Sequence, residues 1–398
     1  MLFSFGLKSS ILLIFFFHGI VFSVTLLIKG IQTENKSSLW LSLFTFLCAL
    51  YITPFMLGYA GWYSGQPYRD FLFYIPFQQL LLLPPVLYFY IKTLLDRSFK
   101  FTAWDYLHFI PAAAYLIYSL VIFLTDKVFL NEYYFYADGR DKDFSSWYQI
   151  AGLCFLTYYL TISLKTYYRY KAITYNVLSF ADQVMFKWAK RFLIAFLVLI
   201  AIRLVFFVVN PEWDEFGRKF WYYLSFSLLF YYVSVSGYTN SLISATSFRD
   251  SPIDSEDDLK FPTIETDSST STQKSAEEKS EIQDLDAWKE KIERLMLNEK
   301  MYENPELVIS DISSQLGTHS RNISQVINQG FNMNFNDFVN HYRLKALLLK
   351  LEAGEHHTKT LLALALECGF NSKSTFNRAF KRSTSLTPKE YIEKLSGK

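Results

Sequence analysis

Basic and polar side chains are concentrated in two short segments near the C-terminal end of this 398-residue sequence. One of them, ECGFNSKSTFNRAFKR (367–382), has a helical spacing that places a polar stripe opposite Phe376 and Phe380. Lys, Ser and Thr can hold phosphates, and Arg and Asn can form hydrogen bonds with base edges. The residues expected to face outward are Lys373, Ser374, Thr375, Asn377, Arg378, Lys381 and Arg382. We therefore predict a surface that contacts nucleic acid.

A similar arrangement lies upstream in LVISDISSQLGTHSRNISQVINQG, which reads as two short helices around Gly317. A short helix, a glycine-containing turn and a second helix form the helix-turn-helix pattern. The outward residues expected on the second of these helices are His319, Ser320, Arg321, Asn322 and Gln325. Ser320 and Lys373 hold comparable positions in the two units. A rigid helix over 334–352 would hold the two recognition helices about 34 Å apart, one turn of DNA.

For each basic helix taken alone, an ordinary solvated face is the favoured explanation. Two in tandem, with matching apolar positions, favour DNA binding. His356 and His357 lie beside Glu352 and Glu355, but adjacent side chains diverge, so we expect a polar turn and no metal there.

Enzymatic chemistry has little support in the sequence. HExxH, GxSxG and paired intramembrane aspartates are absent, so we expect no catalytic residues and no enzyme. The three cysteines are far apart and form neither a disulfide framework nor a CxxC metal motif. We expect no cofactor.

Residues 1–240 are apolar, whereas charged residues are about twice as dense in 241–398. Seven nearly uncharged stretches have about the 20 residues needed to cross a bilayer. They are 10–28, 39–60, 71–91, 106–125, 147–164, 192–209 and 220–238. A buried soluble core does not explain seven such repeats, and the first stretch lacks the small-x-small site of a cleaved signal peptide. The sequence predicts a seven-span membrane part.

Three polar residues inside the expected spans are candidates for a ligand site or an intramembrane polar site. Arg203 either snorkels to the membrane surface or faces an anionic partner inside the bundle. Gln78 and Gln79 precede Pro84-Pro85, where we favour a packing kink over a polar ligand pocket.

Loops 29–38, 92–105 and 165–191 carry more Lys and Arg than the opposite set, so we expect them and the C-terminal part to be cytoplasmic. Residues 241–285 are acidic and rich in Ser and Thr. Such a composition cannot bury a core, which predicts a disordered linker. Proteolytic release through this linker has no support in the sequence.

The C-terminal quarter resembles the AraC/XylS-type double helix-turn-helix domain. The resemblance rests on GFNSKSTFNRAFK (369–381), TPKEY (387–391) and NFNDFVNHYRLKALLL (334–349), in the order typical of that family. Ser385 departs from it, because a glycine usually precedes the TP step, and Gly330-Phe331-Asn332 is an atypical loop. The apolar part resembles the membrane-bound members of this family from Bacteroidota-like bacteria. The resemblance implies sequence-specific DNA binding and transcriptional regulation.

We therefore predict an all-α chain with a seven-helix transmembrane bundle at 1–240, a linker at 241–285 and a two-helix-turn-helix DNA-binding domain at 286–398. The expected function is a transcription regulator tethered to the bacterial inner membrane that senses an envelope or membrane-soluble signal. A transporter or membrane enzyme with a protein-binding tail is the alternative, and constitutive anchoring without sensing is another. Expected partners are double-stranded DNA and the lipid bilayer, with RNA polymerase, a second copy of the chain and an unidentified signal as further candidates.

Overall fold

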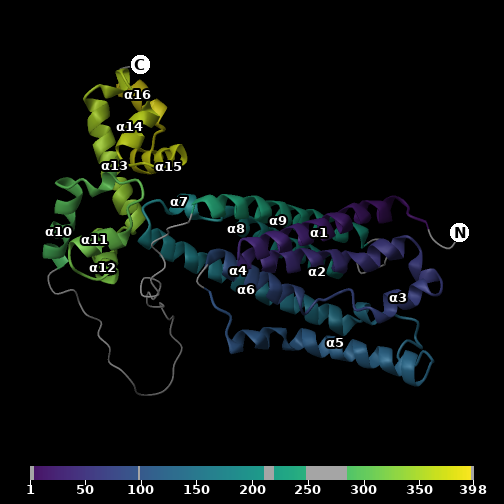
Figure 1. Ribbon diagram of the computed structural model, residues 1–398. Coiled ribbons are helices and arrows are strands. Elements are labelled where there is room, and N and C mark those ends of the chain that lie inside the picture. Colours follow the sequence, from purple (N-terminus) through teal and green to yellow (C-terminus); the bar gives the residue numbers. More distant parts are fainter. Residues whose placement is uncertain (1–3, 97–98, 210–218, 248–284, 396–398) are drawn as a thin grey trace, which may run out of the picture. The chain divides into compact units, whose positions relative to one another are not determined.

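The computed structural model of the chain describes residues 4–96, 99–209, 219–247 and 285–395 (Figure 1). Within these ranges every regular element is a helix, and the only β-type pairing is one isolated bridge. The chain divides into two compact units. The first comprises Met1–Tyr168 and Phe186–Arg249, and the second comprises Arg169–Met185 and Asp250–Lys398. Most of the predicted linker, 248–284, lies outside the described residues.

The first unit consists mainly of long apolar helices. These are α1 (Leu7–Gln32), α2 (Lys36–Tyr59), α3 (Tyr68–Tyr74), α4 (Leu83–Leu95), α5 (Ile110–Phe123), α6 (Ser146–Val177), α8 (Lys187–Val209) and α9 (Phe220–Ser247). Short helical turns lie between them: Trp62–Ser64, Ala103–Phe109, Leu124–Phe129 and Lys142–Phe144. The end of α6 from Arg169 onward belongs to the second unit.

Small residues let α1 and α2 approach closely. A Cβ on Gly19 of α1 would lie 2.8 Å from the Cβ of Ala49 on α2. One turn further along, the Ser23 hydroxyl donates to the Ser42 carbonyl at 3.0 Å, and the Ser42 hydroxyl donates back to the Ser23 carbonyl at 2.7 Å. Small residues and interhelical hydroxyl bonds are typical of helices that pack in a bilayer.

The number of membrane spans differs from the prediction. Three helical stretches of the described chain are long and apolar enough to cross a membrane, instead of seven: Leu7–Gln32, Lys36–Tyr59 and Ala103–Phe129. They contain the first, second and fourth predicted spans. Apolar side chains on α1 and on Ala103–Phe129 are largely exposed, as at Ile14 and Ile117, whereas those of α2 are largely buried.

The third predicted span, 71–91, is not a single helix. The α3 helix ends at Tyr74, α4 begins at Leu83, and Pro76 lies in the irregular segment between them. Pro84 and Pro85 lie in the first turn of α4, where a missing backbone N–H leaves no helical bond unmade. The prolines therefore begin a helix here, whereas a kink within one continuous helix was predicted.

The remaining predicted spans lie within α6, α8 and α9, which are long helices as expected. They are not among the three stretches that meet the length and apolarity requirement. Frequent Tyr and Ser residues lower the hydropathy of α6 and α9. For α8, the side chain of Arg203 and those of the residues near its end lie outside the described residues.

The second unit contains two helix-turn-helix arrangements. Its helices are α7 (Ala181–Val184), α10 (Leu285–Leu297), α11 (Ile309–Gln315), α12 (Ser320–Gly330), α13 (Phe335–Glu352), α14 (Leu361–Glu367), α15 (Lys373–Thr384) and α16 (Pro388–Leu395). Short turns of 3₁₀ helix occur at Met301–Glu303 and Glu355–His357. In Figure 1 the first pair, α11 and α12, is green and the second pair, α14 and α15, is yellow, with α13 between them in the sequence.

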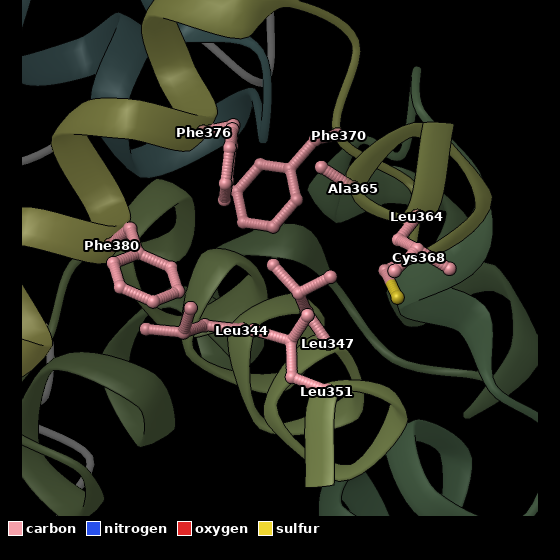
Figure 2. Close-up of a cluster of buried hydrophobic side chains, with 9 residues drawn as sticks. All are labelled: Leu344, Leu347, Leu351, Leu364, Ala365, Cys368, Phe370, Phe376 and Phe380. Carbon is pink, nitrogen blue, oxygen red and sulfur yellow. The ribbon is translucent and has the colours of Figure 1, made fainter. Parts of the chain in front are cut away.

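Each helix pair has an apolar core of the predicted composition. Ile323, Val326 and Ile327 of α12 are fully buried. In the second pair, side chains from α13, α14 and α15 point toward one another (Figure 2). The cluster consists of Leu344, Leu347, Leu351, Leu364, Ala365, Cys368, Phe370, Phe376 and Phe380. Burial of these side chains fixes the orientation of α15 and leaves its polar face outward.

Candidate DNA-binding interface

The first predicted recognition helix is α12. His319 precedes it in an extended conformation and is exposed, as is Arg321. Ser320 and Asn322 are half-buried and bond locally: the two hydroxyl oxygens of Ser320 and Ser313 are 3.0 Å apart, and the Asn322 amide donates to Thr318 at 3.0 Å. The half-buried Gln325 lies one turn further along the helix.

The second predicted recognition helix is α15, and its first turn is fixed by a side-chain cap. The Ser372 hydroxyl accepts from the Thr375 backbone N–H at 3.2 Å. Ser372 also donates to the Thr375 hydroxyl at 2.9 Å. Thr375 is consequently buried, which corrects the prediction that its side chain faces outward. The remaining predicted residues of α15 are exposed: Lys373, Ser374, Asn377, Arg378, Lys381 and Arg382.

Two arginines of α15 are engaged by carboxylates of the same unit. Arg382 Nη1 lies 2.6 Å from Asp337 Oδ1, and the Arg382 side chain is 70% exposed, so solvent screens this pair strongly. Arg378 forms an ion pair with Asp182 of α7. The Asp182 side chain is only 4% exposed, so this second carboxylate is held inside the unit.

Three of the residues with the left-handed backbone conformation that glycine favours lie at the ends of helices of the two pairs. Gly317 (φ +62°) and Gly369 (φ +89°) each stand two residues beyond the first helix of their pair and turn the chain toward the recognition helix. Ser385, with φ +61°, ends α15 in the same conformation. Ser385, which stands where the resemblance leads us to expect a glycine, thus has a glycine-type backbone.

The α13 helix separates the two recognition helices. Its 18 residues make it about 27 Å long at 1.5 Å per residue. Its first turn is capped by Asn334, which accepts from the Asp337 N–H at 2.9 Å. A continuous helix of this length is compatible with a spacing of about one DNA turn between the two recognition helices.

Arg343 anchors α13 from the inside. Its guanidinium is fully buried and donates to the carbonyls of Tyr302 at 2.8 Å and Asn304 at 2.6 Å. It also donates to the side chains of Asn340 and Ser179. Burial lowers the pKa of Arg343 to about 10, which leaves it protonated at neutral pH. A buried cation of this kind is tolerated because neutral oxygens satisfy its N–H groups.

A charged cluster joins α13 to α14. Glu367 accepts from Lys350 at 2.8 Å and from Lys359 at 2.7 Å. These two bonds lower the pKa of Glu367 to about 2. The cluster is exposed and therefore sensitive to salt.

One residue of the predicted intramembrane polar site, Gln78, belongs to a hydrogen-bond network in the first unit. Gln78 is fully buried, and its amide donates to Tyr223 at 3.1 Å and accepts from Gln149 at 2.7 Å. Its backbone N–H donates to Asp143 at 2.9 Å. Gln79 donates to the carbonyl of Pro76 and stabilises its own loop. These groups have protein partners, so their bonding capacity is used internally.

A cavity of about 30 Å³ lies beside this network, lined mainly by apolar side chains and by Gln149 and Tyr222. This volume holds only a water or two. Arg203, the third residue of the predicted site, has its side chain outside the described residues. The described residues also contain no group of three His, Cys, Asp or Glu side chains placed to hold a metal ion.

Sequence reasoning missed three residues that organise the interface. Asp182 and Asp337 reach the arginines of α15, and Arg343 fixes α13. The sequence offered one indication that Asp182 has a specific role, because it is the sole acidic residue of the basic loop 165–191.

The geometry defines a double helix-turn-helix domain, a class that binds double-stranded DNA. Residues 312–394 match the protein family described as helix-turn-helix domain. Uncharacterized HTH-type transcriptional regulators of Staphylococcus aureus strains COL and MSSA476 are each 28% identical to this chain over 92 residues. The aligned region is 23% of this chain and 12% of each relative, so the chain spans a small part of the length of the curated relatives it matches. No solved structure was found to match.

The C-terminal part is therefore a helix-turn-helix domain similar to those of transcription regulators, and such regulators are generally not enzymes.

Proposed function

We propose that the chain is a membrane-tethered, sequence-specific transcription regulator. The observation that carries this proposal is the occurrence, in one chain, of two tandem helix-turn-helix pairs and of apolar helices with exposed apolar faces. Exposed side chains such as Ile14 and Ile117 are unfavourable in water and favourable in lipid. DNA is reached from the cytoplasmic face of the inner membrane, so the second unit belongs on that side.

The proposed DNA contacts are the exposed polar residues of α12 and α15. Arg321 and Arg378 are the candidates for base-edge contacts, and Lys373 and Lys381 are candidates for phosphate contacts. Thr375 is removed from the contact set because its side chain is buried. RNA polymerase and a second copy of the chain remain proposed partners.

The domain division follows from the same proposal. Residues 1–240 form the membrane part, 241–285 the linker and 286–398 the DNA-binding part, with Arg169–Met185 packed into the second compact unit. The helices extend into the proposed linker at both ends, because α9 continues to Ser247 and α10 begins at Leu285. The membrane part would respond to an envelope or membrane-soluble signal.

The test uses the full chain reconstituted in lipid nanodiscs and mixed with fragmented genomic DNA of the source organism. Enrichment of a small set of fragments supports the proposal, and Arg321→Ala should abolish that enrichment while the chain stays folded. As a matched control, Lys345→Ala removes a charge from an exposed position of α13 outside both recognition helices and should leave the enriched set unchanged. Capture of no specific fragments by the folded chain would favour a tail that binds proteins.

A further inference from the structure

A short segment between α6 and α8 is built into the DNA-binding unit. Leu178 forms an isolated antiparallel bridge with Val308, and the Ser179 N–H donates to the Leu307 carbonyl at 3.1 Å. Leu178, Ser179 and Ala181 are fully or almost fully buried. This segment, a single bridge residue followed by a turn and α7, therefore lies against the start of α11, although it is more than a hundred residues away in the sequence.

The receiving surface on α13 is polar and buried. The Asn336 amide donates to the Ser179 carbonyl at 2.7 Å and lies 3.4 Å from the Leu178 carbonyl. The Arg343 guanidinium donates to the Ser179 hydroxyl at 3.1 Å. Both donor side chains are almost completely buried. A buried donor without an acceptor is unfavourable, so this surface is complementary to the carbonyls of Leu178 and Ser179 and to the Ser179 hydroxyl.

The same segment reaches the second recognition helix. Asp182 pairs with Arg378 of α15, and the Tyr175 hydroxyl holds the Asp182 carboxylate at 2.6 Å. The Gln183 amide donates at 3.1 Å to the carbonyl of Asn371, in the turn before α15. A carboxylate carries the negative charge that a DNA phosphate would bring, and an arginine pairs with either group in the same way.

We propose that Leu178–Gln183 is an internal ligand of the DNA-binding unit that competes with DNA for Arg378. This inference rests on the proposed function, because it assumes that α15 contacts DNA. Binding of the duplex through Arg378 requires the Asp182 pair to open. Since the segment joins α6 to α8, a change in either helix can shift the balance between the docked and the DNA-bound arrangement.

The first test measures the affinity of the full chain in nanodiscs for a fluorescent mixed-sequence duplex of about 40 base pairs at low salt, a length that covers two adjacent major-groove sites. Asp182→Asn keeps the shape of the side chain and removes its charge, so affinity should rise about tenfold. Glu352→Gln makes the same charge change at an exposed site on α13 and is the control, with an expected change of less than about twofold. In an Arg378→Gln background, Asp182→Asn should have no further effect.

A second variant keeps the test decisive if Asp182→Asn fails to fold. Leu178→Cys with Val308→Cys places two cysteines at opposed positions of an antiparallel bridge, where Cα atoms are about 4.5–5.5 Å apart and a disulfide fits. The exposed Cys154 is changed to serine in this background. Oxidation should lower DNA affinity about tenfold, and reduction should restore it.

The outcomes separate the two proposals. Equal affinities of the oxidised and reduced double-cysteine protein, or an Asp182→Asn effect no larger than that of Glu352→Gln, would overturn the internal-ligand inference. If Arg378→Gln still weakens binding in that case, the DNA-binding function stands without it. Absence of duplex binding by every variant, the reduced double-cysteine protein included, would overturn both.

Discussion

The two turn glycines predict very different costs for the same substitution. Gly317 and Gly369 occupy the same position in their helix-turn-helix pairs and both have positive φ. An alanine at either position is strained by about 1–2 kcal/mol, partly offset because alanine also restricts the unfolded chain. A Cβ at Gly317 has no neighbour within 4 Å. A Cβ at Gly369 would overlap the carbonyl oxygen of Tyr302 and lie 2.9 Å from the Glu303 Cα.

Backbone atoms cannot rotate away as a side chain can, so relief at Gly369 requires the turn or the Met301–Glu303 helix to move. Such overpacking adds about 1–3 kcal/mol to the destabilisation caused by the substitution. We therefore expect Gly369→Ala to destabilise the second helix pair by about 3 kcal/mol or more. Gly317→Ala should destabilise the first pair by about 1 kcal/mol or less.

The assay is the labelling rate of Cys368, which is 2% exposed and reacts only when the second pair opens. In the full chain with Cys154→Ser, and with labelled peptides identified by mass spectrometry, Gly369→Ala should raise this rate about a hundredfold. Gly317→Ala should raise it about fivefold or less. Equal effects of the two substitutions would refute the close approach of the Gly369 turn to Tyr302.

Three further predictions concern backbone conformation and charge. Ser385→Gly should stabilise the second pair by about 0.5–1 kcal/mol, seen as slower Cys368 labelling, whereas Ser385→Ala should give no gain. Loss of the Glu367 bonds should destabilise this pair as pH falls from about 4.5 toward 2, because the folded pKa is about 2, and Glu367→Gln should flatten that response of the thermal midpoint of the second unit. Burial raises the pKa of Asp143, outside the candidate spans, to about 6, so the folded chain holds its proton more tightly than the unfolded chain. Burial also raises the pKa of the neighbouring Asp141. The thermal midpoint of the first unit should therefore fall as pH rises from about 4.5 to 7, and the Asp141→Asn/Asp143→Asn double variant should remove most of this fall.

Much of the second unit could be read from the sequence. Helical periodicity placed Ile323, Val326 and Ile327 in one core and Phe376 and Phe380 in the other, and all five are buried. Local spacing suffices there because each helix turns one apolar face toward its neighbours. Thr375 escaped the same reasoning, because a side-chain cap at the helix start overrides the position of a residue on the helix face.

The errors arise where distant segments meet or where composition misleads. The pairing of Asp182 with Arg378 joins positions 196 residues apart, which no local pattern indicates. The break between α3 and α4 was missed because an apolar run containing prolines looks the same whether it forms one kinked helix or two helices. The predicted spans within α6 and α9 were identified because they lack charged residues. Their many Tyr and Ser residues keep both helices below the hydropathy requirement.

The most direct test of the central claim is chromatin immunoprecipitation of the full-length, membrane-localised chain beside an Arg321→Ala/Arg378→Ala double variant. We expect discrete promoter peaks for the natural chain that are lost in the variant, with both proteins present in the membrane fraction. The absence of peaks for a folded, membrane-localised chain, or peaks that persist in the variant, would contradict a regulator that reads DNA through α12 and α15.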